Sequence, residues 1–205
     1  PPAGSSQAGH GVTLPPEGVD RARVEKAVRE ILEAIGEDPD REGLLATPAR
    51  VADMYAEIFS GLHEDPDQVL DITFEAGHDE MVGLRDIPLF SWCEHHLVPF
   101  VGKAHLAYIP NVDGRITGLS KLVRVVAVHA ARPQVQENLT TAIADSIERV
   151  LQPRGVLVAV EAEHFCMTLR GVNKPGITTF TSTVRGLFRD DSRTRAEGMA
   201  FIHRQ

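Results

Sequence analysis

Both cysteines of this chain stand beside histidines. The segment Cys-Glu-His-His occupies 93–96 and the segment His-Phe-Cys occupies 164–166, in a sequence of 205 residues with two Cys and nine His. Cys93 and His96 have the Cys-x-x-His spacing that lets two ligands in one tight turn bind the same ion. The residues before Cys166 alternate as in a strand, which puts this side chain on the same face as His164. The obvious hypothesis is that Cys166 meets Cys93, which spacing alone leaves open.

Two thiolates and one imidazole form a ligand set that suits Zn²⁺. Three protein ligands leave a fourth position for water, whereas a structural site usually recruits a fourth protein ligand. His95 and His164 lie beside these ligands and titrate near neutral pH, so they are candidate acid–base groups. Together these features indicate a hydrolytic zinc centre. Structural zinc, two buried thiols and a Cys93–Cys166 disulfide are the alternatives that the sequence leaves open.

A set of polar residues stands at the start of a predicted helix. Ser120, Lys121 and Arg124 open this helix, where free backbone amides, a hydroxyl and two cations would form a cradle for a polyphosphate. Arg170 follows Cys166 by four residues, which can place a cation near the metal. The P-loop pattern GxxxxGK[ST] is absent. A solvated helix face is the alternative interpretation.

The next predicted helix opens with Gln136 and Glu137. An amide and a carboxylate match the hydrogen-bonding edge of a purine, although acidic side chains are also ordinary in a first helical turn. Arg50 lies in the first turns of the second predicted helix and by itself indicates a surface cation. His105, within a predicted strand, and His129, within a predicted helix, are interpreted as structural.

The spacing of apolar residues predicts the elements that position these groups. A first helix runs from Val24 to Ile35 and ends at Gly36, and a second is capped by Thr47 and ended by Gly61. Further helices are predicted over 119–131, 134–151 and 192–203, strands over 80–90, 100–109, 155–168 and 177–185, and a turn over 111–114. Two helices, two strands, two helices and two strands in this order are typical of an α+β fold.

Composition excludes several classes of protein. The net charge of −8 argues against a general binder of nucleic acid or anionic membranes. No apolar run approaches the ~18 residues of a membrane span, and no secretory signal is visible. Two cysteines are too few for a secreted disulfide scaffold. We expect a cytoplasmic protein in which a flexible arm over 1–18, rich in Pro, Gly and Ser, precedes one domain.

Taken together, several motifs closely resemble GTP cyclohydrolase type I. They are CEHH, GLSKLVRVV, RPQVQE and HFCMTLRG, with TPAR at 47–50 and IFSGL at 58–62. The resemblance covers the chain from about residue 19 to its end. Several distinct motifs in the right order make it far more specific than any one motif alone.

The resemblance implies the tunnelling fold. Each subunit is then expected to give a four-stranded antiparallel sheet and two helices over 66–205, preceded by N-terminal helices over 19–65. Five sheets are expected to close into a pentameric barrel, and two such rings to stack as an allosteric homodecamer with active sites between subunits. Closure also removes the exposed sheet edges of a lone subunit.

The resemblance also implies the reaction and its residues. The family hydrolyses GTP at C8 of guanine, releases formate and forms 7,8-dihydroneopterin triphosphate, the first step of tetrahydrofolate and pterin biosynthesis. One Zn²⁺ per subunit falls on Cys93, His96 and Cys166. His95 and His164 fall on the acid–base histidines, with His164 on the N7 side of the purine. Ser120 is expected to contact the triphosphate and to assist the later sugar rearrangement. The remaining GTP contacts fall on Lys121, Arg124 and Arg170 for the triphosphate, Arg50 from a neighbouring subunit, and Gln136 and Glu137 for guanine.

Two other functions would keep this fold. A non-catalytic paralogue would bind GTP without releasing formate. Another tunnelling-fold enzyme, such as a nitrile reductase, would need a nicotinamide cofactor and a catalytic thiol without zinc. The intact CEHH and HFC segments and the absence of a dinucleotide-binding Gly motif favour the hydrolase.

Overall fold

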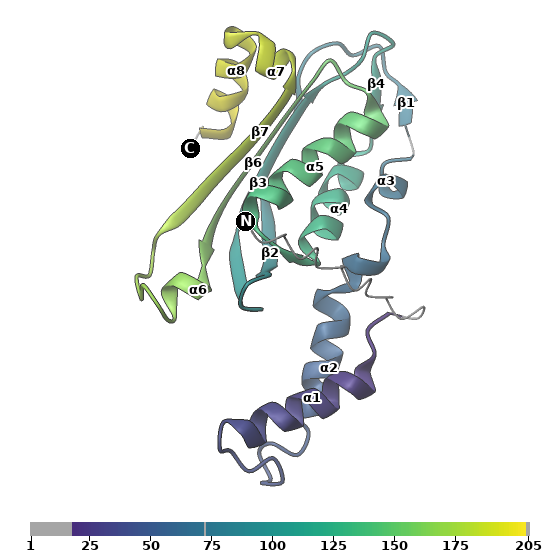
Figure 1. Ribbon diagram of the computed structural model, residues 1–205. Coiled ribbons are helices and arrows are strands. Elements are labelled where there is room, and N and C mark those ends of the chain that lie inside the picture. The colour runs from purple at the N-terminus through teal and green to yellow at the C-terminus, as the bar shows by residue number, and fades with distance from the viewer. Residues whose placement is uncertain (1–17, 72, 204–205) are drawn as a thin grey trace, which may run out of the picture. The chain divides into compact units, whose positions relative to one another are not determined.

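The computed structural model describes residues 18–71 and 73–203 (Figure 1). Apart from Gly18, the predicted arm over 1–18 therefore lies outside the described residues. The chain forms two compact units, one ending at Glu57 and the other beginning at Ile58. Within the described ranges, no helix combines the length and apolarity needed to cross a membrane.

The first unit holds the two leading helices, α1 (Arg21–Ala34) and most of α2 (Thr47–Ile58). The carboxylate of Asp20 caps α1 by accepting a hydrogen bond from the Arg23 N–H at 3.1 Å. Gly36 adopts a φ of 86° just after the helix. Glycine reaches this left-handed conformation without steric cost, which explains why α1 ends where the sequence predicts.

The second unit is built around a five-stranded sheet in the order β5-β2-β3-β6-β7. Its four long strands pair antiparallel, as the family resemblance implies, and β5 adds a short parallel pairing to β2. These strands are β2 (Val82–Cys93), β3 (Pro99–Ile109), β5 (Pro133–Gln134), β6 (Gly155–His164) and β7 (Thr178–Gly186). The two remaining strands, β1 (Thr73–Glu75) and β4 (Arg115–Thr117), pair with each other.

Helices cover parts of both faces of this sheet. Figure 1 shows α4 and α5 across one face, with α7 and α8 against the other. The two long helices are α4 (Leu119–Ala130) and α5 (Gln136–Leu151), and the C-terminal pair is α7 (Leu187–Asp190) and α8 (Ser192–His203). Shorter helical turns are η1 (Ser60–His63), α3 (Pro66–Val69) and α6 (Phe165–Thr168). The predicted α+β architecture is therefore correct.

The apolar run at the start of β6 explains the two layers. Val156, Val158 and Val160 pack into the cluster beneath α4 and α5, while Leu157 and Ala159 pack into the cluster beneath α7 and α8. All five side chains are fully buried. A strand covered on both faces is apolar at every position rather than at alternate ones. This is why the sequence shows a continuous run here.

The strand predicted over 155–168 ends earlier, at His164. In the β3–β6 register His164 pairs with Phe100, and β3 begins one residue before that, at Pro99. Because the ladder has no further partner residue in β3, the chain turns into α6 and satisfies its backbone groups locally. Cys166 therefore lies in a helical turn and not, as predicted, on the strand face that carries His164.

Candidate metal centre and its surroundings

The first ligand segment is the tight turn that joins β2 to β3. The Cys93 N–H donates to Val98 O at 2.9 Å, and the Leu97 N–H donates to Cys93 O at 2.8 Å. Leu97 has a φ of 52°, a left-handed conformation that a non-glycine residue rarely adopts and that is typical of functional turns. In this turn Cys93 Sγ lies 3.8 Å from His96 Nδ1.

The second ligand segment, α6, brings Cys166 to the same place. One ligand atom each from Cys93, His96 and Cys166 lies within 4.8 Å of the other two. Tetrahedral zinc, with bonds of about 2.3 Å to sulfur and 2.0 Å to nitrogen, holds neighbouring ligand atoms roughly 3.5 Å apart. Small side-chain movements would close the group on an ion. Two soft sulfurs and one imidazole therefore fit zinc in both chemistry and spacing.

In the absence of an ion, the surroundings of this group favour the protonated form of the Cys166 thiol. Burial, and then the neighbouring Cys93 thiol, raise the pKa of the Cys166 thiol above its usual value. A bound cation acts in the opposite direction and stabilises the thiolate. Both cysteines are free, so the disulfide alternative is not present in this structure. Arg170 Nη1 lies 3.1 Å from His96 Nε2, which places a guanidinium beside the ligands.

His164 ends β6 immediately before α6, the second ligand segment. Its ring stacks on Phe100, with centroids 4.6 Å apart and planes inclined by 10°. Its Nε2 lies 2.8 Å from Gln136 Oε1. Burial lowers the pKa of His164, and the Glu137 carboxylate acts in the opposite direction. The ring is thus fixed in position and favoured in its neutral form, as a general base requires.

Two supporting residues were missed by the sequence analysis. Phe100 stacks on His164 only because of the β3–β6 register, which no local pattern reveals. Glu163 Oε1 accepts hydrogen bonds from Thr168 Oγ1 and the Gly176 N–H, both at 2.8 Å. These contacts, the backbone one first, lower the pKa of the Glu163 carboxyl. Glu163 thereby fixes the loop between β6 and β7, which carries Cys166; its position beside His164 was the available signal.

Of the predicted polyphosphate residues, Arg170 lies beside the ligand group, whereas the three at the start of α4 lie elsewhere in the chain. The α4 helix begins near Tyr108, whose hydroxyl accepts from the Thr117 N–H, and it ends near Ser91, which donates to Ala130 O at 2.8 Å. Ser91 stands two residues before Cys93. Because a helix of 12 residues is about 18 Å long, the start of α4, with Ser120, Lys121 and Arg124, is far from this subunit's own ligand group.

Two other predicted residues are exposed. His95 lies in the ligand turn with its Nε2 3.8 Å from Glu94 Oε1, and it is not one of the three clustered ligands. Arg50 is an exposed residue of α2, in the first unit. By contrast, Gln136 is only 1% exposed, while the adjacent Glu137 is exposed.

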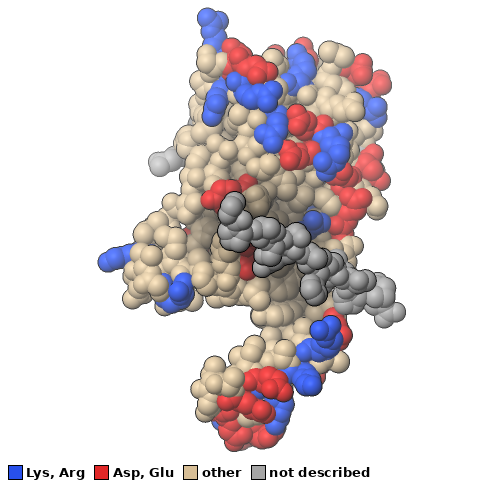
Figure 2. Space-filling model, viewed as in Figure 1, with Lys and Arg blue, Asp and Glu red and all other residues tan. Residues whose placement is uncertain are grey.

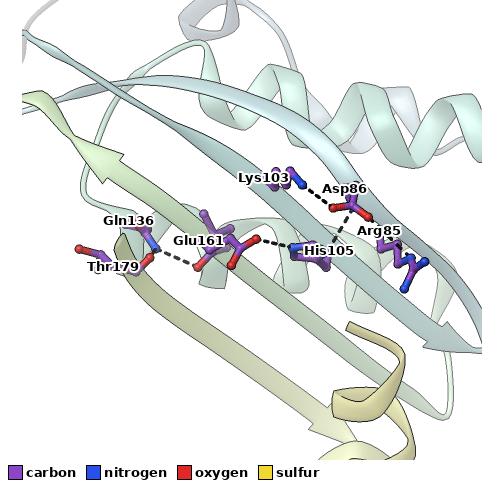
Figure 3. A network of polar contacts seen from close by, with 8 residues as sticks. Arg85, Asp86, Lys103, His105, Gln136, Glu161 and Thr179 are labelled. Atoms are coloured by element: carbon purple, nitrogen blue, oxygen red, sulfur yellow. Dashed lines mark hydrogen bonds and ion pairs between the residues drawn. The ribbon is translucent and has the colours of Figure 1, made fainter. Parts of the chain in front are cut away.

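A separate polar cluster gathers around His105 in the sheet (Figure 3). The buried His105 accepts through Nδ1 from the Asp86 N–H at 3.2 Å, and its Nε2 lies 3.6 Å from Glu161 Oε1. Lys103 Nζ donates to Asp86 Oδ1 at 2.8 Å. Burial lowers the pKa of His105, whereas the charge of the Glu161 carboxylate raises it. This cluster is consistent with the structural interpretation of His105.

Charge is mixed on the surface of the second unit. Figure 2 shows acidic and basic side chains interspersed on the face in view, where the described residues form no extended basic area. A polyanion would therefore be held by a local group of cations, not by the general field of a −8 chain.

Known proteins resemble this chain over most of its length. A family model described as GTP cyclohydrolase I matches residues 24–203. GTP cyclohydrolase 1 of Thermobifida fusca is 64% identical over 189 residues, which are 92% of this chain and 91% of that protein. The Mycolicibacterium gilvum protein of the same name is 60% identical over 196 residues, 96% of this chain and 97% of that one. Among solved structures, the archaeosine synthase QueF-Like in the apo form matches 52% of this chain and 93% of its own, with 16% identity and a TM-score of 0.42, too slight a likeness to bear on function.

Proposed function

Because this chain belongs to the GTP cyclohydrolase I family, we propose that it hydrolyses GTP at C8 of guanine. Formate leaves, and the product is 7,8-dihydroneopterin triphosphate, the first intermediate of tetrahydrofolate and pterin biosynthesis. The observation that carries the proposal is the three-residue ligand group, within 4.8 Å, next to the fixed imidazole of His164.

The metal of this proposal is one Zn²⁺ per subunit, held by Cys93, His96 and Cys166. The donor set and the spacing of the ligand atoms support this choice over a harder cation. When bound, zinc supplies Lewis-acid chemistry for hydrolysis. The reduced state of both cysteines is what metal binding in a reducing cytoplasm requires, and we place the protein there.

The histidines handle protons in this proposal. His164, neutral because burial lowers its pKa, exchanges a proton at the N7 side of the purine. Its stacking on Phe100 fixes the plane in which that transfer occurs. The exposed His95, in the ligand turn, is the second acid–base group, free to change its rotamer as the ring opens.

The guanine base is recognised at the start of α5. The exposed Glu137 carboxylate accepts hydrogen bonds from the N1–H and the amino group of guanine, which an acceptor-only side chain can do in a bidentate way. Gln136 is buried directly behind His164. We assign Gln136 to the same recognition site, where it acts through the residues around it.

The triphosphate is held between subunits. Ser120, Lys121, Arg124 and Arg170 are the proposed contacts, with Arg50 from a neighbour and Ser120 also assisting the sugar rearrangement. The length of α4 separates the first three from their own subunit's ligand group, which supports a site completed by a second copy. We propose a homodecamer of two pentameric rings, each a barrel of five sheets, as the assembly that joins them.

The first experiment measures GTP turnover with and without a chelator. Formate and the pterin chromophore are followed, and zinc is quantified on the same sample. We expect formate release that the chelator abolishes and about one zinc per subunit. Binding of GTP by zinc-loaded protein without formate release would contradict the enzyme assignment and favour the non-catalytic paralogue.

Ligand variants then separate catalytic from structural zinc. Cys93→Ser, His96→Ala and Cys166→Ser are expected to lose zinc and turnover while remaining assembled. An unfolded, monomeric product would instead indicate a structural role for the metal.

A further inference from the structure

The side-chain amide of Gln136 has only one possible orientation. Its Nε2 donates to Val160 O at 2.9 Å and Thr179 O at 3.0 Å, on neighbouring strands (Figure 3). Carbonyl oxygens only accept hydrogen bonds, so the NH₂ group must face them. The oxygen Oε1 therefore points the other way, toward His164.

This orientation decides which nitrogen of His164 carries hydrogen. Gln136 Oε1 lies 2.8 Å from His164 Nε2, and an amide oxygen cannot donate. The hydrogen of the contact must come from His164, so the neutral ring has its proton on Nε2. Stacking on Phe100 prevents the ring from tilting away from this contact. The lone pair of the neutral ring is then on Nδ1.

Two threonine hydroxyls lie beside Gln136, whose amide is held by the carbonyls of Val160 and Thr179. Thr140 Oγ1 donates to Gln136 O at 2.7 Å, so the 2.6 Å contact between the two threonine hydroxyls is a donation from Thr181 to Thr140. Thr181 Oγ1 lies 3.2 Å from Gln136 Nε2, a longer third contact for an NH₂ group whose two hydrogens already reach the carbonyls of Val160 and Thr179. Turning the amide over would set its oxygen against two carbonyl oxygens and its NH₂ against a histidine N–H. Every polar group of the network thus favours the same arrangement.

We propose that Gln136 is a positioning residue that holds His164 in its Nε2–H tautomer and thereby assigns proton exchange with the substrate to Nδ1. The inference rests on the proposed function for its substrate, a purine nucleotide, and deepens the role given to His164. It also revises the expected role of Gln136. With 1% of its surface exposed and its amide bonded within the protein, Gln136 acts on guanine through His164 and not by direct contact.

The test uses Gln136→Met, which keeps the length of the side chain and removes both polar ends. Thr181→Val is the matched control, since it removes one contact of Nε2 but leaves both carbonyl acceptors and the contact with His164. Both variants are prepared as zinc-loaded, full-length protein. Zinc content and assembly are checked first, and kcat and KM for GTP are then measured.

The second readout is independent of activity. ¹⁵N spectra of histidine-labelled protein at alkaline pH distinguish the two neutral tautomers, and the signals of His164 are identified by their loss in His164→Asn. We expect the wild-type protein and Thr181→Val to show the Nε2–H form, and Gln136→Met to gain the Nδ1–H form. In turnover, we expect kcat of Gln136→Met to fall about 10- to 100-fold while KM changes less than about threefold.

Several results would overturn the proposal. One is an Nδ1–H tautomer in the wild-type protein, and another is a His164 signal unchanged in Gln136→Met. A rise in KM with kcat unchanged would restore Gln136 as a direct guanine contact. Should Gln136→Met not fold, the wild-type tautomer alone decides the question. Should the wild-type protein release no formate, the proposed function fails, but the spectra still test the tautomer.

Discussion

Two histidines of this protein make the same kind of contact but have different roles. His129 in α4 has its Nε2 2.9 Å from Ser146 Oγ, and His164 has its Nε2 2.8 Å from Gln136 Oε1. Burial lowers the pKa of both. His129 is 6% exposed within the helical layer, whereas His164 is half-buried and stands two residues before a metal-ligand candidate. Each also has a carboxylate whose charge raises its pKa, Asp67 for His129 and Glu137 for His164.

The difference lies in what the rest of each ring meets. The surroundings of His129 are closed, so its hydrogen bond can only join α4 to α5. His164 is held on one side and partly open on the other, next to the ligand group. A buried, hydrogen-bonded histidine with a lowered pKa is therefore not by itself a catalytic signal. An open edge beside other reactive groups is what distinguishes the catalytic candidate.

Replacing each histidine by alanine should give the largest contrast. We expect His164→Ala to lose turnover by about 10²- to 10⁴-fold, because proton transfer in the transition state is lost, with little change in stability. His129→Ala should keep kcat and lose roughly 2–4 kcal/mol of unfolding free energy through the cavity it leaves. Initial rates and thermal melting on both variants check this. Equal losses of kcat would abolish the distinction.

Part of the loss of stability in acid should come from His129, the histidine whose pKa is lowered to about 4. Its pKa is about 4 in the fold, lowered first by burial and then by Arg132, against an ordinary value of 6.5. The unfolded chain therefore binds the proton more tightly, and stability falls as pH drops from about 6.5 to about 4, by about 3 kcal/mol in total.

The control for this pH profile is His129→Gln, which keeps a polar group near Ser146 but does not titrate. Denaturant unfolding of both proteins across this range gives the difference that belongs to His129. Parallel profiles for the two proteins would show that His129 does not contribute.

The carboxylate beside His164 is expected to act on substrate binding. Glu137→Gln should raise KM for GTP about 10- to 100-fold, because charge-assisted hydrogen bonds to guanine are worth roughly 1.5–3 kcal/mol. Glu148→Gln, the same change near the other end of α5, should alter KM less than about twofold. Steady-state kinetics on both variants test the assignment, which an unchanged KM in Glu137→Gln would refute.

The carboxylate beside His129 should give the smallest effect. Asp67 Oδ1 accepts from Arg149 Nη2 at 2.7 Å, and the Arg149 side chain is 57% exposed. We expect Asp67→Asn to cost less than about 1 kcal/mol, as for other exposed ion pairs. It should also move the lower limit of the His129 pH profile to more acid values, since the carboxylate raises that pKa. Unfolding curves at neutral and acid pH measure both effects, and a cost near that of His129→Ala would contradict them.

Sequence patterns predicted most of the long elements because their causes are local. Apolar spacing placed α4 and α5, and Gly36 marked the end of α1. The short strands β1, β4 and β5 were missed, since two or three extended residues have no periodicity and form only where a partner strand passes. The end of β6 was misplaced for the same reason. Its limit is set by Pro99 in another strand.

The sequence by itself determined the chemistry available to this protein. The types and spacing of Cys93, His96 and Cys166 identified a soft ligand set, and the motifs around them identified the family. Tertiary structure decided how those groups are used. Strand register put Phe100 against His164, and helix packing put Gln136 behind it, while α4 carried Ser120 away from the ligand group. Residue chemistry is carried by each side chain and its near neighbours, but contacts between distant segments exist only after the sheet and its helices have packed.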